Sequence, residues 1–367
     1  MSDSALDAWI EAFPAPADAP FRPRPQGDGV ANGLYTVAAL YDRLDPRDPG
    51  SWDLTYDHAA YVWFVDPATR KPRHLHLGEA IAARIHDAHI GAAIDRYLRN
   101  GRTKVVGFMG GHGNSRGEAA YRQFAAMART LRRKGLQIVT GGGPGLMEAA
   151  NLGAFLAPFD DDELDRSIET LARAHLATDL PGWLRTACET RSRLLGGDWK
   201  AAAPAASRNL GIPTWHYGDE PPNLFATAIG KYFYNSVRED GLVSVASGGL
   251  VFGAGAAGTV QEVFQDVTRN YYRAPGERPT PMVFVGRDFW DPAAHDGEAA
   301  VAHDPGRAPV YPLVRKLAAD GGFSGALMLC DDTEDMARFL EAADLSADGA
   351  ATLAETRLAR GADSDAV

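Results

Sequence analysis

From residue 104 onwards the chain repeats one pattern: a short apolar run, a turn rich in glycine, and a segment with helical periodicity. The apolar runs have the length of buried strands and cover 104–109, 136–140, 212–215, 248–252, 281–285 and 326–330. Strands that alternate with helices need crossover connections, which produce a parallel sheet covered on both faces. The sequence therefore predicts an α/β fold, a Rossmann-like doubly wound parallel sheet with helices on both faces.

Segments with helical periodicity join these runs. One continues to Lys134, where Gly135 provides a helix-ending glycine. A second starts at Leu146, and a long helix is predicted over 223–240. Glycine-rich turns follow three of the predicted strands at their carboxyl ends, which is where ligands bind in such sheets.

An N-terminal extension, residues 1–102, precedes this pattern. Proline, aspartate and glycine dominate 14–50, which predicts an extended arm with turns. The aromatic run at 60–66 predicts a short strand, and apolar residues at helical spacing predict a helix over 78–99.

The main domain is expected to span 103–345. An insertion at about 160–205 interrupts it, with an acidic start and an alanine- and proline-rich end. Residues 346–367 form a C-terminal tail in this division of the chain.

Composition limits the classes of partner. The chain has a formal net charge of -11, and an acidic surface disfavours nucleic-acid binding. No apolar stretch approaches the ~20 residues that cross a membrane, and the first residues lack the pattern of a signal peptide. The only cysteines, Cys188 and Cys330, lie far apart and fit a reducing compartment. We expect a cytoplasmic protein.

The first candidate site is the turn after the run at 136–140. Its glycines are Gly141, Gly142, Gly143 and Gly145. Glycine lets a ligand approach the backbone, and the following helix start presents N–H groups and a positive dipole end. We interpret the turn as a phosphate-binding loop, although a tight strand-to-helix turn needs no ligand.

The second candidate turn joins the run at 248–252 to another helix. Its residues are small: Gly255, Ala256, Ala257, Gly258 and Thr259. Thr259 is suited to capping the helix and to donating its hydroxyl to a phosphate. Glu262, three residues on, either completes a capping box with Thr259 or faces the same site.

Two further groups of residues are candidates. In the turn at 110–117, Gly110, Gly111 and Ser115 add N–H and hydroxyl groups. His112 is either a base or a solvated loop residue, and Arg116 either a cation of the site or an exposed helix-start residue.

Within the helix predicted over 223–240, Lys231, Asn235 and Arg238 are spaced four and three residues apart. At this spacing they share one face, which is either solvated or part of the site.

Two motifs resemble those of the Lonely Guy (LOG) family. The segment 141–151, GGGPGLMEAAN, resembles its GGG-x-G-x-M motif, and 254–262, AGAAGTVQE, resembles its PGG-x-GT-x-x-E motif. The likeness extends over about 103–345. Members were formerly labelled lysine decarboxylases, and characterised ones are phosphoribohydrolases that cleave nucleoside 5′-monophosphates to base and ribose 5-phosphate.

The resemblance implies a catalytic pair, Glu262 and Arg238, with Glu148 able to bind ribose hydroxyls or simply to favour its helix start. It implies no metal and no cofactor, a nucleoside monophosphate as partner, and a homodimer or larger homo-oligomer. Ala254 and Ala256 replace a proline and a glycine of the motif. The extension and the insertion, absent from the short plant-type enzymes, favour an ordinary nucleotide over a cytokinin precursor.

Two alternatives stay open at this point. The same fold is similar to that of molybdenum-cofactor carriers and nucleotide sensors, which hold a phosphorylated ligand without cleaving it. An NAD-dependent oxidoreductase fits less well, because the turn at 110–117 is not GxGxxG and the run at 136–140 ends on Thr140 instead of an acid.

Overall fold

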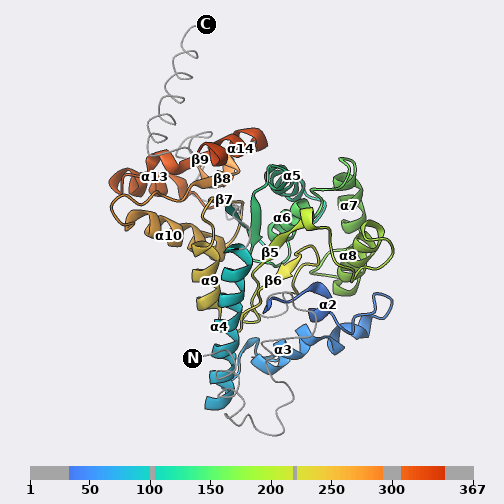
Figure 1. Ribbon diagram of the computed structural model, residues 1–367. Helices are drawn as coiled ribbons and strands as arrows, with labels where there is room; N and C mark the ends of the chain where they lie inside the picture. The colour runs from blue at the N-terminus through green and yellow to red at the C-terminus, as the bar shows by residue number, and fades with distance from the viewer. Residues whose placement is uncertain (1–32, 100–103, 218–220, 292–306, 344–367) are drawn as a thin grey trace.

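A seven-stranded parallel sheet forms the centre of the protein in the computed structural model, which describes residues 33–99, 104–217, 221–291 and 307–343 (Figure 1). The strands, in chain order, are β3 (Val105–Met109), β4 (Gln137–Thr140), β5 (Asn209–Gly211), β6 (Ala228–Ile229), β7 (Gly249–Phe252), β8 (Met282–Val285) and β9 (Leu327–Cys330). Their order in the sheet is β6-β5-β4-β3-β7-β8-β9, and every pair is parallel.

The chain winds in both directions from β3. It adds β4, β5 and β6 on one side, then returns to the other side of β3 and adds β7, β8 and β9. Adjacent strands whose connections leave in opposite directions mark a switch point, here between β3 and β7. The predicted doubly wound α/β fold is confirmed.

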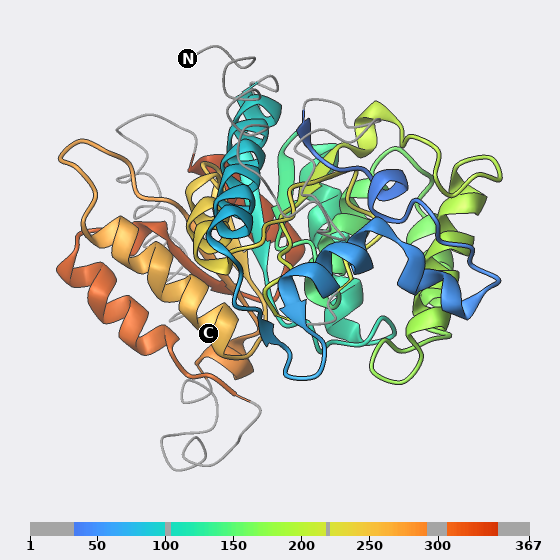
Figure 2. The same cartoon turned by 90° about the horizontal axis from the view of Figure 1, so that it is seen from below.

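Helices cover both faces of this sheet (Figure 2). In the described part of the main domain, the helices outside the insertion are α5 (Ala119–Arg133), α6 (Leu146–Phe155), α9 (Asn235–Ser244), α10 (Ala257–Tyr271), α11 (Arg287–Trp290), α13 (Tyr311–Asp320) and α14 (Thr333–Ala342). Helices α5 and α6 pack together and against the strands, with α14 beside α5, whereas α10 packs against α9 and α13. The end of α5 is as expected, since Gly135 follows it with φ +91°.

The insertion folds into two helices, α7 (Glu163–Leu171) and α8 (Leu180–Leu194), followed by the short 3₁₀ helix η3 (Ala205–Ser207). Helices α7 and α8 pack against each other at the end of the molecule opposite α10 and α13 (Figures 1 and 2). Another 3₁₀ helix, η5 (Ser324–Ala326), leads into β9.

The N-terminal segment is more structured than expected. It contains α2 (Val37–Leu40), η2 (Pro49–Leu54), α3 (Tyr56–Phe64), the hairpin of β1 (Val65–Asp66) and β2 (Lys71–Pro72), and α4 (Leu77–Arg99). Helix α4 confirms the helix predicted over 78–99. The strand predicted over 60–66 is wrong for 60–64, because the Thr55 hydroxyl accepts from the His58 N–H at 3.2 Å and starts a helix instead. Only its last two residues form a strand, β1. Of the predicted arm at 14–50, residues up to 32 lie outside the described residues, as does the tail 346–367.

This segment is anchored to the edge of the sheet. Tyr35 and Ile229 exchange two backbone hydrogen bonds of 2.8 Å, which cover the outer side of β6. The buried Lys231 Nζ lies 2.6 Å from Asp57 Oδ1, and Asp87 accepts from backbone N–H groups just before α9. Residues 33–99 are therefore an integral part of the fold.

Two predicted elements of the main domain are displaced. Strand β5 lies just before the run at 212–215, and Pro213, which has no N–H to donate, follows it. The helix predicted over 223–240 is wrong: the segment forms a loop and β6, and α9 begins only at Asn235. Lys231 consequently lies before the helix and does not share its face with Arg238.

Among the described residues no helix is long and apolar enough to cross a membrane. Cys188 and Cys330 are both buried and free.

Candidate functional site

The three glycine turns lie together at the carboxyl ends of β3, β4 and β7. The Gly111 N–H donates to the Ala254 carbonyl oxygen at 2.8 Å, and the Leu146 N–H donates to the Gly111 carbonyl oxygen at 3.0 Å. The turn after β3 therefore joins the other two. Its Gly110 packs so closely on Leu146 that an added Cβ would lie 2.8 Å from the leucine Cδ1.

The turn Gly141–Gly145 is buried and tightly packed. Gly142 and Gly145 have φ values of +73° and +70°, which side chains other than glycine rarely adopt. A Cβ on Gly145 would overlap the Gly111 carbonyl oxygen, and one on Gly142 would lie 2.6 Å from Pro213 Cδ. Packing alone therefore requires these two glycines.

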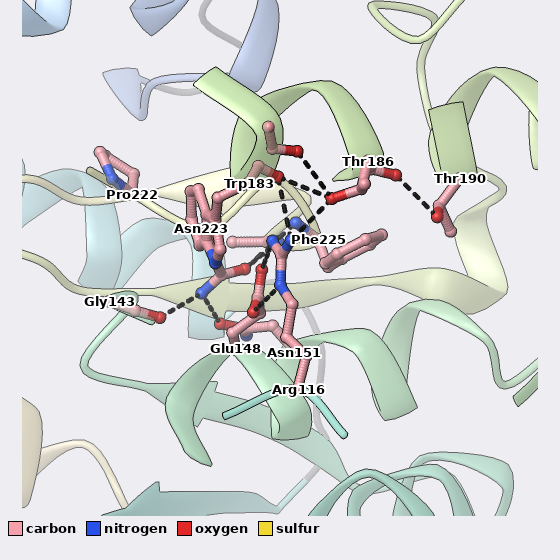
Figure 3. Close-up of polar contacts among 12 residues, drawn as sticks. Arg116, Gly143, Glu148, Asn151, Trp183, Thr186, Thr190, Pro222, Asn223 and Phe225 are labelled. Carbon is pink, nitrogen blue, oxygen red and sulfur yellow. Dashed lines mark hydrogen bonds and ion pairs between the residues drawn. The ribbon is translucent and has the colours of Figure 1, made fainter. Parts of the chain in front are cut away.

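A network of buried polar side chains holds the backbone of this turn in place (Figure 3). The Asn223 backbone N–H donates to the Gly142 carbonyl oxygen at 2.9 Å, and Asn223 Nδ2 donates to the Gly143 carbonyl oxygen at 3.0 Å. Asn151 Oδ1 accepts from Asn223 and from the Thr140 hydroxyl, at 2.8 and 2.7 Å. Asn223 was not predicted as a site residue, because the local pattern over 223–240 favours a helix.

The turn before α10 is open by contrast. Ala256, Ala257 and Gly258 are exposed, and a Cβ on Gly258 would meet no atom within 4 Å. The helix starts at Ala257 with Ala256 as its N-cap, so Thr259 is its third residue. The prediction that Thr259 caps the helix, and with it the capping box with Glu262, is wrong. The Thr259 side chain instead packs against Gly255.

Glu262 is buried beside the upstream arginine. Burial raises the pKa of Glu262 to about 7, the nearby Arg238 charge lowers it, and the Glu239 charge raises it. No hydrogen bond joins the Glu262 carboxyl group to another described residue. A Cβ added to Gly141 would lie 3.1 Å from Arg238 Nη1. Arg238 is thus close to the first glycine turn and near enough to Glu262 to lower its pKa.

Arg238 is fixed by its own helix. Its Nε donates to Asn235 Oδ1 at 2.9 Å, and its Nη2 lies 3.9 Å from Glu239 Oε1. Asn235 Nδ2 donates to Glu239 and, at 2.9 Å, to the Tyr217 hydroxyl. Gln261, on α10, donates to Glu239 and ties the two helices together. The guanidinium group is therefore held in one orientation.

Arg116 and Glu148 form a buried ion pair (Figure 3). Arg116 Nε and Nη2 donate to the two Glu148 oxygens at 2.8 and 2.6 Å, and Nη1 donates to the Trp183 carbonyl and the Thr186 hydroxyl, both at 2.9 Å. Of the two alternatives for Arg116, the exposed helix-start residue is wrong, since its side chain is only 3% exposed. The binding of ribose by Glu148 stays a prediction, but both of its oxygens already accept hydrogen bonds.

A cavity of about 590 Å³ opens next to this pair. Its lining includes Ser115, Gly145, Glu148, Trp183 and Tyr217. Neither Arg238 nor Glu262 lines it, and neither does the turn before α10. Tyr217 connects the two places, because its hydroxyl accepts from Asn235, the residue that holds Arg238.

No group of three or more histidine, cysteine, aspartate or glutamate side chains is placed to hold a metal ion within the described ranges. Comparison of the chain with protein-family models and with curated proteins finds no match in either case. The likeness to the LOG family therefore rests on the two motifs alone.

Proposed function

We propose that the protein is a LOG-like enzyme that hydrolyses the N-glycosidic bond of a nucleoside 5′-monophosphate, giving free base and ribose 5-phosphate. The observation that carries the proposal is the position of Glu262: a buried carboxyl group without a hydrogen-bond partner among the described residues, next to Arg238 and on the helix that starts at an open glycine turn. A pKa of about 7 suits a group that exchanges a proton at neutral pH.

The start of α10 is the proposed place of the 5′-phosphate. Exposed backbone at Ala256, Ala257 and Gly258 leaves room for an anion, and the first N–H groups of a helix have no partner within it. Glu262 lies on the second turn of the same helix. Binding energy from the phosphate would thus hold the ribose beside the carboxylate.

Cleavage of the glycosidic bond develops positive charge on the ribose ring, as in other glycoside hydrolyses. In its ionised form Glu262 stabilises this charge and accepts a proton from the attacking water. Arg238 either holds the ribose or phosphate side or assists the departing base. The ionised glutamate is the active form, so the rate is expected to rise with pH through about 7.

The test is release of free base and ribose 5-phosphate from AMP, GMP, CMP and UMP. Glu262→Gln should lower the rate roughly 10²–10⁴-fold and remove the rise with pH, while circular dichroism shows an intact fold. No cleavage of any of the four by the wild-type chain would count against the proposal.

Glu239→Gln provides the matched control. Because the Glu239 charge raises the pKa of Glu262, the variant should stay active and its rate should rise at lower pH than in the wild type. An unchanged pH profile would mean that Glu262 is not the titrating group.

The second candidate is a non-catalytic carrier of a nucleotide or of the molybdenum cofactor. It is favoured by the cavity of about 590 Å³, which has the size of a small-molecule site but is not lined by Glu262 or Arg238. A ligand that copurifies with the protein and is not turned over would support this function.

A further inference from the structure

The cavity beside the first glycine turn is built from segments far apart in the sequence. Its polar lining includes His112 and Ser115 from the turn after β3, His175 from the insertion, and Arg70 from the N-terminal hairpin. Leu176, Ala177 and Trp183, all from the insertion, supply an apolar wall. The two parts of the chain that the family resemblance does not explain thus meet at one cavity.

The charge of this lining is positive. Glu148 is the only acidic residue among the described side chains that line the cavity, and Arg116 neutralises it through two hydrogen bonds. Arg70 makes no ion pair with any described residue. Pro144 and Gly145 also line the cavity and bring the positive end of α6 to it. Although the whole chain has a net charge of -11, the lining of this cavity is positive and suited to binding an anion.

The backbone of Arg70 gives an independent indication. Arg70 has φ +54° and is the only residue other than glycine with a positive φ in the described part of the chain. Its N–H donates to the Asp66 carbonyl oxygen at 2.7 Å and closes the turn between β1 and β2. Glycine or asparagine would occupy this position with less strain, and strained residues gather at functional sites.

We propose that this cavity binds a phosphoryl group, with the Arg70 guanidinium as its charged ligand and the apolar wall of the insertion against the organic part of the same molecule. Guanidinium groups bind phosphate oxygens through paired N–H donors, which explains why an arginine is kept in an unfavourable conformation. The phosphoryl group belongs either to the nucleotide substrate or to a second phosphorylated compound.

The variant Arg70→Gly removes both the guanidinium charge and the backbone strain. Loss of the charge should affect ligand binding, whereas loss of the strain should affect thermal stability. Glycine adopts a positive φ without cost, so the variant should keep or raise the melting temperature. Calorimetric titration with AMP and with pyrophosphate should show at least one of the two binding about tenfold or more weaker than to the wild type. The matched control is Arg73→Ala, on the same hairpin, which removes an exposed arginine that does not line the cavity and should bind both probes as the wild type does.

The two probes distinguish the sources. Weaker AMP binding in Arg70→Gly, with pyrophosphate competing against AMP in the wild type, assigns the substrate's own phosphate to this cavity and not to the start of α10. Weaker pyrophosphate binding alone, with AMP unaffected, assigns it to a second compound. Wild-type affinity of Arg70→Gly for both probes, or no binding of either to the wild type, would overturn the proposal. All chains in these titrations also carry Glu262→Gln, so that hydrolysis of AMP is suppressed during the measurement. The result therefore does not depend on hydrolase activity.

Discussion

Helices α6 and α10 both follow a glycine turn and both bury carboxyl groups, but they differ in what those groups contact. Glu148 on α6 is fully buried, and both of its oxygens accept hydrogen bonds from Arg116. On α10, Glu262 has no hydrogen bond to a described residue, and neither oxygen of the fully buried Asp266 has a partner. The difference indicates that the carboxylate of α6 stabilises the fold, whereas α10 holds the groups whose protonation can change.

The turns that precede these helices also differ: the turn before α6 is tightly packed, whereas the turn before α10 is open to solvent. Gly145 is required by its positive φ and by contact with Gly111, while Gly258 has open space around it. Glycine richness by itself does not identify a ligand site, because close packing of backbone against backbone requires glycine as well. Access to solvent favours the turn before α10 as the place of the phosphate.

The largest change in stability is expected from breaking the ion pair between Arg116 and Glu148 of α6. Glu148→Gln leaves the buried Arg116 without a counter-charge and should lower the free energy of unfolding by about 3 kcal/mol or more. Glu262→Gln should cause no comparable loss in urea titrations at pH 7, because Glu262 has no hydrogen bond to give up. Equal losses in the two variants would remove the distinction between the helices.

An intermediate effect is expected at Asp266. Burial raises the pKa of Asp266 to about 7, and the Arg269 charge lowers it. The unfolded chain, with an ordinary aspartate pKa near ~3.9, binds fewer protons between pH 4 and 7, so the stability of the fold falls as the pH rises through this window.

Asp266→Asn imitates the protonated acid, so its stability advantage over the wild type should grow from near zero at pH 4 to a few kcal/mol at pH 8. Thermal unfolding across this pH range measures the effect. A variant whose stability follows the same pH profile as the wild type would show that Asp266 does not titrate in the fold.

The smallest change in stability is expected at Gly258. Alanine favours a helix over glycine, so Gly258→Ala should stabilise the protein by roughly 0.5–1 kcal/mol. Its methyl group would also stand at the proposed phosphate position and weaken AMP binding in calorimetric titrations. Gly145→Ala is the contrasting variant and should destabilise the fold. If Gly258→Ala binds AMP as the wild type does, the phosphate does not approach the start of α10.

Local sequence patterns were sufficient for most of the sheet. Strands β3, β4, β7, β8 and β9 follow from apolar runs and the turns after them, because both signals lie within a few residues of each other. The region from 223 to 240 could not be predicted in this way. Asn223 supports the first glycine turn and Ile229 pairs with Tyr35, so contacts with distant segments override the local preference for a helix.

The candidate site, like the fold, has features that the local sequence predicts and features that depend on contacts between distant segments. The sequence was sufficient to predict that three glycine turns lie at the carboxyl edge of a parallel sheet and that Glu262 follows one of them. Strand–helix alternation places every such turn at that edge, and the position of Glu262 is read directly along the chain. Only the tertiary structure decided which carboxyl group is paired and which is not. Arg116, the partner of Glu148, comes from the turn after β3 and is itself held by the insertion, whereas Arg238 comes from α9. Burial and charge pairing therefore depend on residues that no local pattern brings together.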